Sequence, residues 1–235
     1  MGKSLIQQAR GKGSFTYRVR RRAYRHRISY PTLDTNGKAV ITKLINSSGH
    51  TAPLAEIKID NKTFIVPAAN GIYEGQEIYI GKRPDKKIES GDIIELKDVP
   101  QGTKVFNIEL FPGSGGKFLR SAGNSGIAMN KEKGIVEVLV KRRQLKLHEN
   151  ARAIIGVVSG DGRKLKPIVK AGKRYYMMKA IGRKWHRTSA VKMNAVDHPF
   201  GGGRGKRIKS KIAKRNAPAG AKVGHLRPRR TGRKK

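Results

Sequence analysis

The stretch AVDHPFGGGRGK, residues 195–206, holds the residue types in this chain that are best suited to chemistry. An aspartate beside a histidine could orient a general base, and the same imidazole could bind a metal ion or donate a hydrogen bond to an anion. A catalytic triad is not favoured, because Pro199 restricts His198 to extended conformations and no serine carries the glycine-flanked nucleophile signature. We therefore expect no catalytic residue and no enzyme activity, and we interpret His198 as a binding side chain.

Metal and nucleotide sites are not supported by the pattern either. The six histidines are scattered and cysteine is absent, so no zinc-like spacing occurs. The stretches PGSGGK (112–117) and GGGRGK (201–206) miss the spacing of a nucleotide-binding loop, although their glycines let backbone N–H groups approach a phosphate closely. We expect no cofactor and no metal held by the protein itself; magnesium would come only with bound RNA.

Positive charge is concentrated at the two ends of the chain. Lys and Arg number 53 against 16 Asp and Glu, for a formal charge of +37. Residues 1–30 hold nine basic residues and no acid, and residues 162–235 hold 25 basic residues and one acid, Asp197. Self-repulsion of this size calls for a polyanionic partner, most simply nucleic acid. No basic amphipathic helix or apolar run indicates a membrane or a signal peptide, so we expect a cytoplasmic protein.

The central part, residues 31–161, is nearly neutral and reads as β-rich. The predicted strands are the short Ile- and Val-rich runs AVITKLI, AEIKID, KTFIVPA, QEIYIG, DIIELKDV, KVFNIEL, GIVEVLV, RQLKLH and RAIIGVV. Turn sequences such as DN, ANG and ESGD separate them. Many short strands at close spacing favour small barrels or sandwiches. We predict an all-β protein with a domain boundary near Val99, and a single larger β domain is the alternative.

Three stretches together resemble one known family. They are NIELFPGSGGKFLRSAGNSG (107–126), RAIIGVVSG (152–160) and SAVKMNAVDHPFGGGRGK (189–206), and they resemble the second protein of the large ribosomal subunit, in its archaeal and eukaryotic branch. The resemblance implies an OB-fold barrel followed by an SH3-like barrel, with long basic extended N- and C-terminal arms. The expected domains are a basic N-terminal extension (1–34), an OB-type RNA-binding barrel (35–98), an SH3-like barrel (99–172) and a basic C-terminal extension with a Gly-rich loop (173–235).

The resemblance also implies a function. The chain would be a structural constituent of the large ribosomal subunit, binding large-subunit rRNA and other ribosomal proteins and supporting association with the small subunit. The loop 194–204 would lie close to the peptidyl-transferase region. Phe200 stands where bacterial members commonly have a second histidine, which leaves His198 as the position of interest. The residues expected to contact RNA are Arg18, Arg20, Arg21, Arg22, Arg25, Arg27, Lys117, Arg120, Asn194, Asp197, His198, Gly201, Gly202, Gly203, Arg204, Lys206 and Arg207.

Two other functions use similar features. An RNA-binding translation factor also has small β-barrels, but a factor that leaves the ribosome does not need two arms this basic. A DNA-compacting protein would use the same charge without preference for folded rRNA. Retention on large subunits and competition between rRNA and duplex DNA distinguish the three functions.

Overall fold

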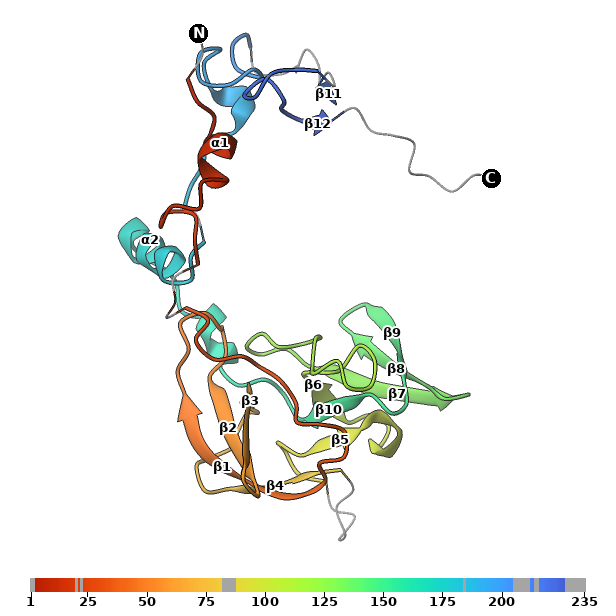
Figure 1. The fold of residues 1–235 in the computed structure, drawn as a ribbon. Helices are drawn as coiled ribbons and strands as arrows, with labels where there is room; N and C mark the ends of the chain where they lie inside the picture. Colours follow the sequence, from red (N-terminus) through yellow and green to blue (C-terminus); the bar gives the residue numbers. More distant parts are fainter. Residues whose placement is uncertain are drawn as a thin grey trace. The chain divides into compact units, whose positions relative to one another are not determined.

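The computed structural model of the chain describes residues 3–19, 21, 23–81, 88–183, 185–204, 212–213 and 216–226. Two compact units divide the chain. The sheet unit is Arg21–Arg174, and the terminal unit combines Met1–Arg20 with Tyr175–Lys235. Strands dominate the described residues and helices are few, so the predicted all-β class is confirmed (Figure 1). The finer boundaries at residues 34, 98 and 172 remain predictions.

The sheet unit is organised around a ten-stranded sheet of order β3-β2-β1-β4-β5-β10-β6-β7-β8-β9 (Figure 1). Neighbouring strands are antiparallel except β4 and β5, which pair in parallel through Ile80 and Ile93. The strands are β1 (Gly37–Ile45), β2 (Leu54–Ile59), β3 (Lys62–Pro67), β4 (Glu77–Ile80), β5 (Ile93–Glu95), β6 (Lys104–Phe106), β7 (Gly126–Glu132), β8 (Ile135–Val140), β9 (Arg143–His148) and β10 (Arg152–Ile155).

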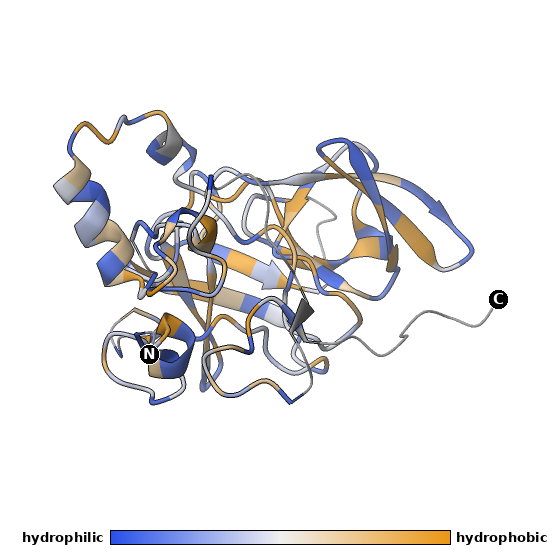
Figure 2. Ribbon diagram, turned by 90° about the horizontal axis from the view of Figure 1, so that it is seen from above, coloured by the Kyte–Doolittle hydropathy of each residue, from blue (hydrophilic) through white to orange (hydrophobic). Residues whose placement is uncertain are grey.

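Alternation of apolar and polar residues sets which face of each strand is buried. In β2, Ile57 and Ile59 are buried while Lys58 between them is exposed. In β8, Val136 and Val138 are fully buried. This follows because successive side chains of a strand point to opposite faces of the sheet. Figure 2 shows hydrophobic residues concentrated in the strands, as the alternating sequence runs predict.

Two separate hydrophobic cores share β5 and β10. Ile93 and Ile154 belong to the first core, whereas their chain neighbours Ile94 and Ile155 belong to the second. Period-two alternation therefore makes the β5–β10 pair a common wall between the two cores. The predicted division into an OB-type barrel and an SH3-like barrel stays a prediction. The first core also includes Val158, which lies well after the predicted domain boundary near Val99. The residues of the two cores therefore overlap along the sequence.

Three strands differ from the sequence runs. Strand β7 was not predicted, because GIAMNKE contains few β-branched residues. It pairs with β8 through a tight hairpin turn at Lys133–Gly134, whose φ angles of 48° and 76° are both positive. The run DIIELKDV forms only β5 and then a 3₁₀ turn, Leu96–Asp98. The run KVFNIEL forms only β6, because Asn107 takes a positive φ of 49° and ends the strand.

The described residues of the terminal unit form only a small core. Its elements are α1 (Ile6–Arg10), most of α2 (Ala171–Ala180), a 3₁₀ turn at Ala190–Lys192, and the short parallel pair β11 (Ile212–Ala213) and β12 (His225–Leu226). Among its described residues, the buried hydrophobic side chains are those of Leu5 and Val223. Two buried apolar side chains contribute little stabilisation, so polar contacts matter more in this unit than in the sheet unit.

Candidate nucleic-acid interface

The loop around His198 closes on itself through backbone hydrogen bonds. The N–H groups of Asp197 and His198 both donate to the carbonyl oxygen of Asn194, at 3.0 and 3.2 Å, and Gly201 N–H donates to His198 O at 2.8 Å. A Cβ atom at Gly201 would lie 2.2 Å from the Asn194 carbonyl oxygen. Only glycine fits at position 201, so this glycine lets the loop close tightly on its own backbone.

Hydrogen bonding fixes the tautomer of His198. Its Nδ1 atom accepts a hydrogen bond from the backbone N–H of Phe200 at 3.0 Å, so in the neutral ring the proton sits on Nε2. The ring therefore offers Nε2–H as a donor, and a nitrogen that carries its proton cannot act as a general base. The ring of Phe200 lies 5.2 Å from the imidazole, centroid to centroid.

Asp197 pairs with the N-terminal segment. Its Oδ1 atom lies 3.1 Å from Lys3 Nζ, and Lys3 N–H donates to Val196 O at 3.0 Å. The salt bridge is exposed and contributes little stability, but it directs the Asp197 carboxylate to a lysine. Lys3, His198 and Gly220 also line one pocket of about 330 Å³. Residues close to the start of the described chain and residues around Gly220 thus meet at this loop within the terminal unit, which the sequence alone does not indicate.

A second loop, residues 109–120, lies in the sheet unit and is organised from its buried side. The Glu109 carboxylate accepts hydrogen bonds from Gly113 N–H at 3.3 Å and Gly115 N–H at 3.0 Å. Lys117 and Arg120 follow, and both are exposed. Arg120 Nη1 also donates to Gly116 O at 3.4 Å. The loop is therefore held in shape before any ligand arrives, with two cations at its surface.

The carboxylate that shapes this loop belongs to a buried ion pair. Arg152 Nη2 lies 3.0 Å from Glu109 Oε1, with side-chain exposures of 7% and 0%. Burial raises the pKa of the Glu109 carboxyl, whereas hydrogen bonds from Arg152 and Gly115 lower it. The lowering effects together are larger, so the pKa of Glu109 lies below its ordinary value. The sequence analysis did not predict this ion pair. The available signal was a charged residue inside each of two apolar runs, Glu109 in NIEL and Arg152 directly before AII.

The same arginine holds the segment that precedes β1. Its Nη1 atom donates to the carbonyl oxygens of Pro31 and Thr32 at 3.0 and 3.2 Å, and its guanidinium lies 5.1 Å above the centroid of the Tyr30 ring. Tyr30 Oη donates to Asn107 O at 2.6 Å. Burial, reinforced by the negative charge of Glu109, raises the pKa of Tyr30 well above its ordinary value, so the hydroxyl stays protonated.

Most of the predicted RNA-contacting residues that the structure describes fall into three groups. Asn194, Asp197, His198, the glycines 201–203 and Arg204 form one loop of the terminal unit; Lys117 and Arg120 lie on the 109–120 loop; and Arg21, Arg25 and Arg27 are exposed on the sheet unit. Arg18 is exposed in the terminal unit. The predicted Arg20, Arg22, Lys206 and Arg207 lie outside the described residues.

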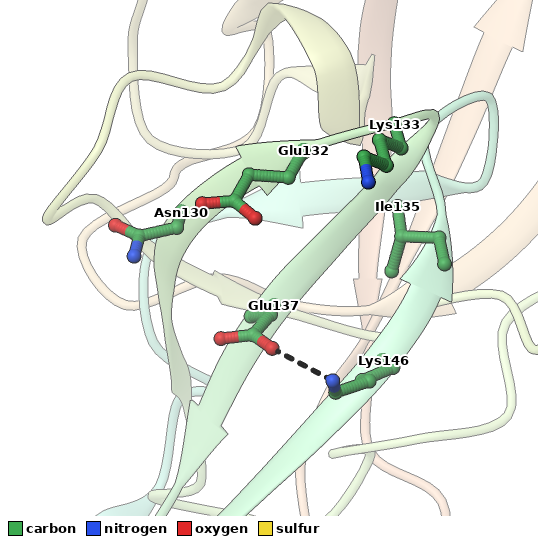
Figure 3. Close-up of a pocket in the computed structure, with 6 residues that line it drawn as sticks. All are labelled: Asn130, Glu132, Lys133, Ile135, Glu137 and Lys146. Carbon is green, nitrogen blue, oxygen red and sulfur yellow. Dashed lines mark ion pairs between the residues drawn. The ribbon is translucent and has the colours of Figure 1, made fainter.

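A pocket on the β7–β8–β9 face has a different character. It measures about 180 Å³ and is lined by Glu132, Glu137, Lys133 and Lys146 among others (Figure 3). Lys146 Nζ lies 3.3 Å from Glu137 Oε1, which neutralises both charges (Figure 3). Two carboxylates beside two lysines leave no net attraction for a polyanion, so this face is not part of the candidate interface.

The described residues contain no group of three or more His, Cys, Asp or Glu side chains placed to hold a metal ion. Within the same residues, no helix is both long enough and apolar enough to span a membrane.

Comparison with known proteins identifies the family. The family model described as Ribosomal Proteins L2, C-terminal domain, matches residues 89–220. The large ribosomal subunit protein uL2 of Archaeoglobus fulgidus is 43% identical over 238 residues, covering 99% of each chain. The uL2 protein of Sulfurisphaera tokodaii is 42% identical, and the match covers 100% of this chain and 99% of that protein. The uL2 protein of Desulfurococcus amylolyticus is 40% identical, and the match covers 100% of both chains. The chain therefore belongs to the uL2 family of large-ribosomal-subunit proteins, in its archaeal type.

Proposed function

We propose that this chain is a structural constituent of the large ribosomal subunit in the cytoplasm, that it binds large-subunit rRNA, and that it catalyses no reaction itself. The observation that carries the proposal is the match of the whole chain to relatives named large ribosomal subunit protein uL2. Charge supports it, because the terminal unit contains a single acidic residue, Asp197, among many cations.

We further propose that the loop 194–204 contacts rRNA near the peptidyl-transferase region and that the protein supports association with the small subunit. Three features support a contact role for the loop: the backbone is tight, the Asp197 carboxylate is paired with Lys3, and His198 offers Nε2–H as a donor. A phosphate, a 2′-hydroxyl or a base acceptor would suit that donor. The exposed Lys117 and Arg120 would pair with phosphates at a second contact.

Sedimentation after a high-salt wash tests the coarse function. A structural constituent should remain with large subunits, whereas a translation factor should come off. Competition between folded large-subunit rRNA and duplex DNA then separates the DNA-compacting alternative, which predicts equal affinity. Loss of the protein from washed large subunits, or equal binding of both nucleic acids, would contradict the proposal.

Two substitutions at His198 test the role of Nε2–H. In His198→Gln the side-chain amide nitrogen takes the place of Nε2 and can still donate, so large subunits should form in normal yield with a normal single-turnover rate of peptide-bond formation. In His198→Asn the shorter amide corresponds to Nδ1 instead, and subunit yield should fall. Normal assembly of His198→Gln with a peptide-bond rate reduced by about 100-fold would instead support a general base.

A further inference from the structure

An aromatic pocket lies in the terminal unit, and none of its lining residues belongs to the 194–204 loop. It combines the rings of Phe15, Tyr17, Tyr175 and Trp185, which come from two segments far apart in the chain. Its volume is about 560 Å³, within the range of roughly 300–1,000 Å³ typical of sites for small organic groups. Phe15 and Tyr17 stand among the arginines of the basic N-terminal segment, a pattern typical of stacking on unpaired bases, and the pocket is also lined by Arg18, one of the contacts predicted from the sequence. Tyr175 and Trp185 were not predicted.

The rings of this pocket remain open to solvent. Phe15 is 93% exposed and Tyr175 is 40% exposed, and Trp185 is only partly buried. Exposed aromatic rings gathered in one place are unfavourable unless a ligand covers them. The rings therefore form a surface that is available for stacking.

Positive charge surrounds the same pocket. Arg18, Lys179, Arg183 and Arg187 line it, and none of the described residues that line it is acidic. Lys179 Nζ lies 5.6 Å from the centroid of the Tyr175 ring. A cationic ligand would be repelled, and an apolar protein segment would leave the four cations without partners. A ligand with a flat apolar face and attached negative charge satisfies both parts of the site.

We propose that the aromatic pocket binds an unpaired nucleobase of single-stranded RNA, with the flanking phosphates paired to the surrounding cations. The proposal rests on the proposed RNA-binding function and adds a base-stacking site to it. Stacking requires a base that has left the helical stack, so a loop or bulge fits the pocket and a continuous duplex does not. Guanidinium groups can both pair with phosphates and stack on rings, which explains why three of the four cations are arginines.

Trp185 supplies a built-in probe, because it is the only tryptophan in the chain. The full-length protein is titrated with three ligands of equal phosphate number: a short single-stranded RNA, its abasic counterpart and an RNA duplex. Fluorescence of Trp185 reports the pocket, and anisotropy of a label on each ligand reports total binding. We expect all three ligands to bind and only the base-containing single strand to quench Trp185 strongly.

Substitution of Phe15 extends the test without disturbing the fold, because this side chain is almost fully exposed. Phe15→Ala should weaken binding of the single strand by roughly 5- to 150-fold, the range expected for loss of one base-stacking contact. It should leave binding of the abasic strand unchanged, and Phe15→Tyr should restore affinity. Tyr73→Ala removes an exposed aromatic side chain of the sheet unit and should have no effect.

The outcomes separate this proposal from the broader one. Equal quenching by the abasic strand, or equal loss of affinity for all three ligands in Phe15→Ala, would overturn base stacking while RNA binding survives. Quenching by an acidic peptide but not by RNA would assign the pocket to a protein partner and overturn the proposal as well. Absence of binding to all three RNA ligands would instead refute the proposed function.

Discussion

Arg152→Met tests the buried pair that joins the 109–120 loop to the segment before β1. Methionine keeps much of the aliphatic length of arginine but removes its charge, which leaves the fully buried Glu109 carboxylate without a counter-ion. Removing one partner of a buried pair usually costs about 3–5 kcal/mol of stability. Backbone N–H groups of Gly113 and Gly115 still donate to the carboxylate, so we expect the lower end, about 3 kcal/mol.

Thermal and urea unfolding of the full chain, followed by far-ultraviolet circular dichroism, measures this loss. For a unit of this size, about 3 kcal/mol corresponds to a fall in Tm of about 6–12 °C. Arg142→Met is the matched control, because Arg142 is exposed in the turn between β8 and β9, and its stability should change by less than about 0.5 kcal/mol. Adding Glu109→Gln to Arg152→Met removes the unpaired charge and should recover part of the stability.

The pH dependence gives an independent check. Because the folded-state pKa of Glu109 is lowered, its contribution to stability is present above the unfolded value of about 4.3 and is lost as the pH falls through the folded value. The difference between wild type and Arg152→Met should therefore shrink below about pH 4. A penalty below about 1 kcal/mol at pH 7, or a difference that does not change on acidification, would refute a buried, compensated pair.

Two further predictions concern the His198 loop and the shared wall. Gly201→Ala should open the loop and speed amide hydrogen exchange at Gly202, whose N–H donates to Met193 O, because a Cβ at position 201 would lie 2.2 Å from the Asn194 carbonyl oxygen. Gly203→Ala is the control, because a Cβ at position 203 meets open space and adds only the strain of a φ of +73°, about 1–2 kcal/mol. It should have little effect on the exchange at Gly202. Equal exchange rates in the two variants would contradict the close packing at Gly201. A fragment of residues 35–98 should fail to give a cooperative unfolding transition, whereas a fragment of residues 21–174 should give one, because the first core needs Ile154 and Val158; cooperative melting of the short fragment would show that the cores are independent.

Local patterns in the sequence predicted much of the sheet unit. Alternating runs identified strands such as β2, β8 and β9. In a strand with one buried face, every second residue is buried, so apolar and polar residues alternate along the sequence. Strand β7 was missed because its side chains are weak strand formers and its position depends on pairing with β8. Helix α2 was missed because Tyr175, Tyr176 and the two methionines that follow are consecutive and form no apolar stripe.

The site was predictable where it is contiguous in sequence. The loop 194–204 follows from its own residues and from resemblance. The pairs Lys3–Asp197 and Glu109–Arg152 were not predicted, because each joins segments distant in sequence and no local spacing encodes such a contact. Phe15 and Tyr17 could be recognised as stacking candidates because they stand among arginines. The pocket itself was not predicted, because Phe15 and Trp185 are far apart along the chain.

The common wall of β5 and β10 has a consequence for folding during synthesis. Strands β1 to β5 emerge early, but neither core can close until β10 emerges, since Ile154 completes the first core and Ile155 the second. Pairing between segments so far apart is slow, because the intervening chain must first be ordered into a loop. Apolar surface on the early strands therefore stays uncovered on the nascent chain for much of translation, and the two cores then form together.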